Sequence, residues 1–141
     1  MMPNNVKPPV RGAQLGRYAG YLLSAVVMLI LVADGLVDLF APQLIQAQMT
    51  ETGFPASLAM PLGCIILLCA ALYVVPATAV VGAIFITGFA GGAICAHFRI
   101  AEIGSPPELF SLMLGALPWG GLYLRHDRLR PLLPLRSSDS S

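Results

Sequence analysis

Residues 58–96 read LAMPLGCIILLCAALYVVPATAVVGAIFITGFAGGAICA, and this stretch decides the fold because it contains no charged side chain. A helix needs about 20 apolar residues to cross a bilayer core about 30 Å thick, so the stretch is long enough for two crossings. Pro76 divides it, since proline lacks the backbone donor that a continuous helix requires. We therefore predict membrane-spanning helices over residues 58–75 and 77–96, joined by a tight turn at Val75-Pro76-Ala77.

Two further spans flank this hairpin. Residues 18–39 are apolar apart from one serine and two aspartates. This span follows basic residues, as a secretory signal peptide does, but no small-residue cleavage site comes after it, so we expect it to be retained. The last span, 106–124, opens at Ser105-Pro106-Pro107-Glu108. Serine at the cap, proline at the first helical position and glutamate three residues after the cap predict a capping box.

The composition agrees with a membrane protein. Hydrophobic residues make up 57% of the 141 residues, charged residues only 11%, and the mean hydropathy is +0.78. Soluble domains are about 45–50% apolar and about 25% charged. The sequence predicts an all-α fold, an integral membrane four-helix bundle over residues 14–130. We expect disordered tails at 1–13 and 131–141, and a short interfacial helix at 43–52, between Pro42 and Gly53.

The basic residues predict the orientation of the bundle. Seven of the eight Lys and Arg residues lie towards the two ends of the chain, and only Arg99 lies in a connection between spans. By the positive-inside rule, both termini are expected to be cytoplasmic, in a plasma membrane of the bacterial inner-membrane type. Aromatic side chains that prefer the headgroup region fall near that same end of their helices: Tyr18, Tyr21, Tyr73, Trp119 and Tyr123.

Glycines recur at helical spacing in two of the spans. In the first span, Gly16 and Gly20 are four residues apart, and in the third Gly88 and Gly92 have the same spacing, with Gly91 beside them. Small residues spaced in this way let two membrane helices approach with their backbones close together. We therefore predict that these five glycines are helix-packing positions.

A polar cluster is predicted at the outer end of the bundle. At about 100° per residue, Asp34 and Asp38 share the glycine face of the first helix, and Arg99 shares that of the third, while His97 points the opposite way. Because they share the glycine face, we expect the aspartates to face the bundle and not the lipid. All four residues are expected at a similar depth in the membrane. Two interpretations remain open: an aspartate pairs with Arg99 as a structural lock, or Asp34 serves a proton, a solute or a partner.

No catalytic, cofactor-binding or metal-binding residue is predicted. Nothing in the sequence matches a nucleophilic triad, a phosphate-binding glycine loop or a metal-ligand spacing. His97 and His126 are expected on opposite sides of the membrane, so they would not hold one haem together. The cysteines lie within apolar stretches and are expected to pack as small apolar residues: Cys64, Cys69 and Cys95. A net charge of +1 argues against nucleic acid as a partner.

The chain resembles the DoxX-like family of small four-helix membrane proteins over roughly residues 14–136. Asp38 stands where a basic residue is usual in that family. Named members include a membrane subunit of a thiosulfate:quinone oxidoreductase and a membrane partner in oxidative-stress complexes. The matching stretches, of which the run 87–93 is the most specific, are Asp34-Gly35, Gly53-Phe54-Pro55, Pro76-Ala77-Thr78-Ala79, Gly82-Ala83, residues 87–93, His97-Phe98-Arg99 and residues 119–125.

Three functions are therefore compared. The first is a membrane module or accessory subunit that is not an enzyme by itself and packs against a second copy or another membrane protein through its glycine faces. The second, implied by the resemblance, is a membrane subunit of a quinone-linked oxidoreductase, which would have quinone as its cofactor. The third is a carrier of a small solute or proton that uses Asp34. The sequence favours the first function, a membrane module or accessory subunit. The partner that the sequence predicts directly is the lipid bilayer around the helices.

Overall fold

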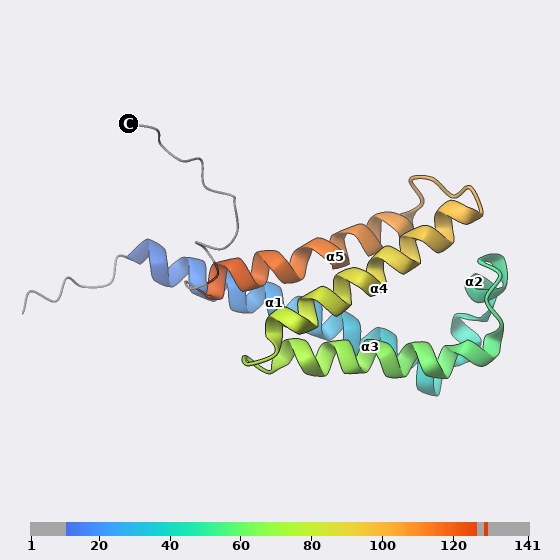
Figure 1. The fold of residues 1–141 in the computed structure, drawn as a ribbon, viewed down its shortest axis with the longest axis horizontal. Coiled ribbons are helices and arrows are strands. Elements are labelled where there is room, and N and C mark those ends of the chain that lie inside the picture. Colours follow the sequence, from blue (N-terminus) through green and yellow to red (C-terminus); the bar gives the residue numbers. More distant parts are fainter. Residues whose placement is uncertain (1–10, 127–128, 130–141) are drawn as a thin grey trace, which may run out of the picture.

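The structure is a computed structural model that describes residues 11–126 and residue 129. The predicted tail 131–141 lies outside the described residues. So does the predicted tail 1–13, except for residues 11–13, which form the first turn of a helix. The predicted all-α fold class is confirmed: four main helices run side by side along the long axis of the molecule (Figure 1).

The four main helices are α1 (Arg11–Phe40), α3 (Ala59–Val74), α4 (Ala79–Arg99) and α5 (Pro106–Arg125). Between α1 and α3 the chain forms the short helices η1 (Pro42–Leu44), α2 (Gln46–Glu51) and η2 (Ala56–Leu58). At about 1.5 Å per residue, the 30 residues of α1 are about 45 Å long, which exceeds the bilayer core.

The predicted turn between α3 and α4 is confirmed. Val75 has an extended backbone, and the Thr78 amide donates to the Val75 carbonyl at 3.0 Å. The Thr78 hydroxyl donates to the Leu72 carbonyl at 2.8 Å, so a carbonyl that the end of α3 leaves without a helical partner is satisfied. The helix therefore ends because Pro76 cannot continue it, and a side chain closes the turn.

The start of α5 follows the predicted capping pattern in part. The Glu108 amide donates to the Ser105 hydroxyl at 3.4 Å, which confirms Ser105 as the cap. The Glu108 carboxylate accepts from the Gly104 amide at 2.6 Å, one residue before the donor of a standard capping box. Gly104 has a φ of +79°, and this left-handed turn brings its amide to the carboxylate.

The helices form a ring in which α1 packs against α3 and α5, and α4 packs against the same two helices. The start of α1, the end of α5 and the α3–α4 turn lie at one end of the bundle, which we call the Pro76 end (Figure 1). The short helix α2 and the α4–α5 loop lie at the opposite end, the α2 end (Figure 1). The core between them is built from Val27, Leu31, Ile66, Cys69, Ala70, Tyr73, Ala79, Ala83, Ile86, Leu114 and Leu122.

Three helices are long and apolar enough to cross a membrane, so the chain is a multi-pass membrane protein. They are the stretches Gln14–Phe40, Ala56–Val74 and Ala79–Arg99, with mean hydropathies of 2.3, 2.2 and 2.0. The fourth main helix, α5, is not among them. Its Glu108, three prolines and glycines lower its apolar content, although at 20 residues it is about 30 Å long.

Candidate functional site

Arg99 lies at the α2 end, where it contacts the connection between α1 and α3. Its Nη2 donates a hydrogen bond to the carbonyl of Thr52, the residue that ends α2. Gly53, with a φ of +73°, follows directly, and a Cβ atom at this position would lie 2.6 Å from Arg99 Nη2. The left-handed backbone favours glycine at this position, and the guanidinium lies where a side chain at residue 53 would begin.

His97, on the same helix end, pairs with a residue of the next loop. Its Nδ1 lies 2.8 Å from Glu102 Oε2, and the imidazole is buried while the glutamate is half-exposed. Among residues 11–126 and 129, this is the contact that we find between a basic and an acidic side chain within 4 Å. It joins the end of α4 to the α4–α5 loop, next to Ala101, whose φ of 60° is left-handed.

The two aspartates differ in their surroundings, which corrects the prediction that both face the bundle. Asp38 is buried and packs against α3, where an added Cβ on Gly63 would lie 2.8 Å from the Asp38 Cβ. Asp34 is exposed. The buried line of α1 reaches Gly35 instead, which lies against Gly63 and Leu67, so Asp34 points about 100° away from it.

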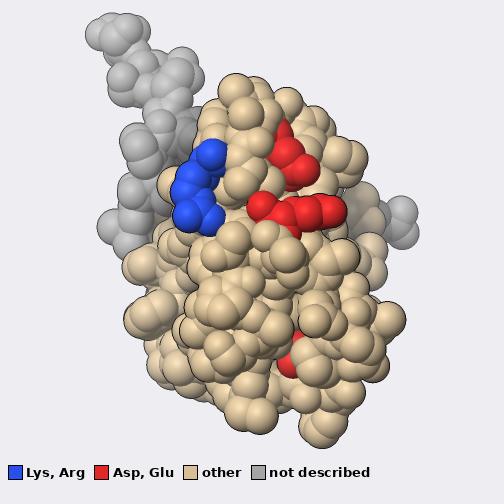
Figure 2. Space-filling model, turned by 90° about the vertical axis from the view of Figure 1, so that its right-hand side faces the viewer, with Lys and Arg blue, Asp and Glu red and all other residues tan. Residues whose placement is uncertain are grey.

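The predicted pairing of an aspartate with Arg99 is therefore not found among the described residues. Among the described residues neither Asp34 nor Asp38 forms an ion pair with Arg99, because its guanidinium contacts Thr52 and Gly53. His97 and Arg99 do lie on opposite faces of α4, one buried and one exposed. Acidic surface is more extensive than basic surface at this end (Figure 2).

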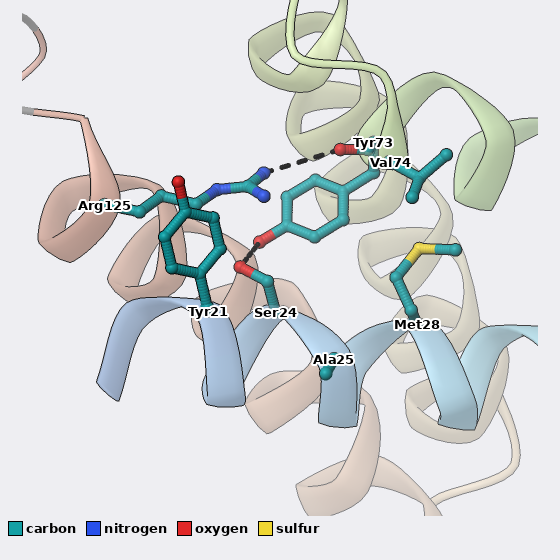
Figure 3. Close-up of a pocket in the computed structure, with 7 residues that line it drawn as sticks. All are labelled: Tyr21, Ser24, Ala25, Met28, Tyr73, Val74 and Arg125. Carbon is teal, nitrogen blue, oxygen red and sulfur yellow. Dashed lines mark hydrogen bonds between the residues drawn. The ribbon is translucent and has the colours of Figure 1, made fainter. Parts of the chain in front are cut away.

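A second polar network, which the sequence analysis did not find, lies at the Pro76 end. The Tyr73 hydroxyl donates to the Pro118 carbonyl at 3.0 Å and lies 3.0 Å from the Ser24 hydroxyl (Figure 3). Because the tyrosine proton goes to the carbonyl, Ser24 must donate to the Tyr73 oxygen. Both side chains are buried, so the network joins α1, α3 and α5 inside the bundle.

Tyr73 is thus not a headgroup-facing aromatic residue, as the sequence suggested, because none of its surface is exposed. Arg125, at the end of α5, extends over it: the guanidinium carbon is 5.1 Å from the ring centroid, and Nη2 approaches the Tyr73 carbonyl at 3.5 Å (Figure 3). Gly121 makes room for the network, since a Cβ there would lie 2.5 Å from Ser24 Oγ.

A third set of hydrogen bonds joins α4 to α5. Trp119 Nε1 donates to the Thr87 hydroxyl at 2.9 Å. That hydroxyl lies 2.9 Å from the Ala83 carbonyl and 3.1 Å from the Gly115 carbonyl, both of which can accept its proton. Pro118 removes a donor from the middle of α5 and so frees the carbonyl of Leu114, four residues earlier; the Thr87 hydroxyl lies against the next carbonyl, that of Gly115.

The glycines fall into two groups. A Cβ added to any of five helical glycines would lie less than 3.0 Å from another helix, and we call these the packed glycines: Gly20, Gly35, Gly63, Gly82 and Gly121. At Gly88, Gly91 and Gly92 of α4, the open glycines, a Cβ would meet nothing within 4 Å, and the same holds for Gly16. Of the five predicted packing positions, Gly20 contacts another helix of this chain, and the other four do not.

The sequence could have indicated one of the residues that were missed, because Ser24 lies on the same helical face as Gly20. Pro118 gives no such signal: the carbonyl that it frees is that of Leu114, four residues earlier, whereas Tyr73 bonds to the carbonyl of Pro118 itself. Within residues 11–126 and 129, no group of three or more His, Cys, Asp or Glu side chains is arranged to hold a metal ion. Cys69 is buried in the core, whereas Cys64 and Cys95 are exposed thiols.

The chain belongs to the DoxX-like family: the model of that family matches residues 22–121, more than half of the chain. The predicted resemblance is confirmed over this narrower range. The match includes Ser24, Tyr73, Pro118 and the open glycines, and Arg125 lies just beyond it. Comparisons with curated proteins and with solved structures find no match.

Proposed function

We propose that this chain is a membrane module that acts by association, and that the outward face of α4 is the surface through which it associates. The observation that supports this is the pair Gly88 and Gly92, which are exposed and where an added Cβ would meet no described residue within 4 Å. Glycine lowers helix stability by about 1 kcal/mol relative to alanine, and contact with lipid does not offset this loss. Close packing of another helix against the glycine does offset it.

The surface extends along one side of α4. Exposed side chains continue it in both directions at helical spacing, with Phe85 on one side of the glycines and Cys95 on the other. Small residues repeated every four positions are typical of membrane helix pairs that pack with their backbones close together. No charged residue lies on α4 before Arg99, whose guanidinium contacts the Thr52 carbonyl.

A second copy of the same chain is the partner that this geometry fits best. Two copies inserted with the same orientation present α4 in parallel, so a two-fold axis brings Gly88 and Gly92 of one copy against the same residues of the other. The absence of charge along this face means that such a pair carries no like-charge repulsion within the membrane.

We further propose that α5 is a fourth crossing and that both termini face the cytoplasm of a bacterial inner membrane. The arrangement of α5 supports the crossing, since it lies alongside α1 and α4 (Figure 1). An even number of spans places the start of α1 and the end of α5 on the same side of the membrane. Both lie at the Pro76 end of the bundle, together with the α3–α4 turn, which agrees with four spans (Figure 1). Reporter insertions at Pro76 should report cytoplasm and those at Thr50 and Gly104 the other side; cytoplasmic signals at Gly104 would contradict four crossings.

The association is tested by counting copies of the full chain in native membranes, for example by single-molecule photobleaching. The wild type should be dimeric and the double variant Gly88→Leu with Gly92→Leu monomeric, because leucines there separate the two backbones. Ala71→Leu is the matched control, since Ala71 is an exposed small residue on α3. A monomeric wild type, or dimers that persist in the double variant, would overturn the proposal.

A further inference from the structure

A cleft of about 180 Å³ opens at the Pro76 end, between α1, α3 and α5 (Figure 3). Its floor is the Ser24–Tyr73 network, and Arg125 extends from α5 across it towards Tyr73 (Figure 3). The proposed self-association does not use this cleft, because none of its residues belongs to α4. It is lined by Tyr21, Ser24, Ala25, Met28, Tyr73, Val74 and Arg125.

Arg125 supplies a positive charge that forms one side-chain hydrogen bond to the described residues. The stacking on Tyr73 and the 3.5 Å approach to the Tyr73 carbonyl hold the guanidinium in place, but the latter is a long hydrogen bond. Arg125 Nε is buried and has no acceptor among the described residues. An anion that reaches the guanidinium from the cleft would form charge-assisted hydrogen bonds with it, which are stronger than hydrogen bonds between neutral groups.

The rest of the lining is apolar. Met28, Val74 and Ala25 lie further along the helices from Arg125, on the side towards the middle of α1 (Figure 3). The half-exposed ring of Tyr21 is at the same end as the arginine. The cleft therefore has a cationic end at Arg125, where α5 ends, and an apolar end at Met28, in the middle of α1. A ligand with a charged head and an apolar tail fits both ends.

We propose that this cleft binds an anionic phospholipid, with the headgroup phosphate against Arg125 and an acyl chain against Met28 and Val74. Arginine binds phosphate oxygens through paired N–H donors, and basic pockets between membrane helices bind lipid headgroups in this way. A soluble phosphate shares the headgroup chemistry but would leave the apolar part of the cleft without a ligand. The continuity of the cleft from Arg125 to Met28 favours the lipid.

His126, which follows Arg125 and lies outside the spans, provides a spectroscopic readout. Burial and the positive charge of Arg125 lower the pKa of its imidazole. A phosphate placed against Arg125 would offset that charge, so the pKa of His126 should rise when lipid binds. This rise can be followed by NMR titration of the labelled imidazole.

The experiment uses the purified full chain in detergent and measures binding by native mass spectrometry and by thermal shift. Phosphatidylglycerol should bind at least about tenfold more tightly than phosphatidylcholine, because the choline ammonium of phosphatidylcholine offsets the phosphate charge that Arg125 would bind. Inorganic phosphate and glycerol 3-phosphate form the second arm and should bind much more weakly than the lipid. Equal affinity for the soluble anions would assign the site to a free phosphate and overturn the lipid proposal.

Three variants complete the test. Arg125→Gln should reduce phosphatidylglycerol binding at least about tenfold, whereas Arg17→Gln, which removes an exposed charge outside the cleft, should not. Arg125 also contacts Tyr73, so Arg125→Gln could lower lipid binding by disturbing the fold. Ala25→Phe avoids this problem, because it fills the cleft without removing a hydrogen bond. It should lower lipid binding with the fold intact. Equal losses in the two arginine variants, or unchanged binding in Ala25→Phe, would overturn the proposal.

Discussion

Gly82 and Gly88 lie six residues apart on α4, yet their surroundings are opposite. Gly82 lies directly against the backbone of Tyr73, where α3 and α4 converge on the Pro76 turn, and there is no space for a Cβ. Gly88 faces outward, with nothing within 4 Å of an added Cβ. The first glycine is explained by the fold of one chain. The second is not explained by any contact among the described residues, and we propose that it packs against a second copy of the chain.

The largest expected effect separates these two positions. Gly82→Ala should destabilise the protein by at least about 3 kcal/mol, because the new methyl group overlaps the α3 backbone, which cannot move aside without breaking the turn. Gly88→Ala should leave the monomer as stable as the wild type or stabilise it by up to about 1 kcal/mol. Thermal unfolding in detergent measures both, and equal losses would remove the distinction between packed and open glycines.

The buried tyrosine of the packed region should give the next largest effect. Tyr73→Phe leaves the Pro118 carbonyl and the Ser24 hydroxyl without their common partner, which should cost about 1–2 kcal/mol. Tyr18→Phe is the control, because Tyr18 is 74% exposed and should tolerate the change. A Tyr73→Phe protein as stable as the Tyr18→Phe protein would show that the network contributes nothing to the fold.

At the α2 end, a double-mutant cycle asks which group Arg99 interacts with. Arg99→Gln and Asp34→Asn should be additive within about 0.5 kcal/mol, since the structure shows no ion pair between them. Amide exchange at Thr52 and Gly53 should instead speed up in Arg99→Gln alone, because the Thr52 carbonyl loses its donor. A coupling above about 1 kcal/mol would restore the lock between Asp34 and Arg99.

The smallest expected effect is a pH dependence at the Pro76 end. Burial and the charge of Arg125 lower the folded-state pKa of His126, so the unfolded chain binds this proton more readily than the folded one. Stability should therefore decrease as the pH falls through the unfolded value of about 6.5, and level off below the folded pKa. His126→Gln should flatten this part of the stability profile. A wild-type profile that rises towards low pH would contradict the sign.

Features set by neighbouring residues along the chain could be predicted from the sequence. The turn at Pro76 and the cap at Ser105 depend on a missing donor and on a hydroxyl next to a helix start, both of which are local. The helical character of the four apolar stretches is likewise a property of each stretch. That His97 and Arg99 lie on opposite faces of α4 also followed from helix geometry alone.

Contacts between distant segments could not be predicted in the same way. Tyr73 and Pro118 are 45 residues apart, and Arg99 and Thr52 are 47 apart, so their meeting depends on how the helices are arranged. Whether a glycine face points inward also depends on that arrangement. Gly20 and Gly88 belong to similar sequence patterns, yet Gly20 lies against α5, whereas a Cβ added to Gly88 would meet no described residue within 4 Å. The prediction that Asp34 faces the bundle was wrong because Gly35, the next residue, occupies the face of α1 that packs against α3.

Cys95 permits the most direct test of the association through α4, because its exposed thiol lies three residues beyond Gly92 on the same outward side. A chain that keeps Cys95 as its one cysteine should form a disulfide-linked dimer when its membranes are oxidised, since parallel copies bring these thiols close together. A chain that keeps only Cys64, exposed on α3, should not. Gly92→Leu should abolish the Cys95 cross-link. Cross-linking through Cys64 but not Cys95 would contradict the proposed surface.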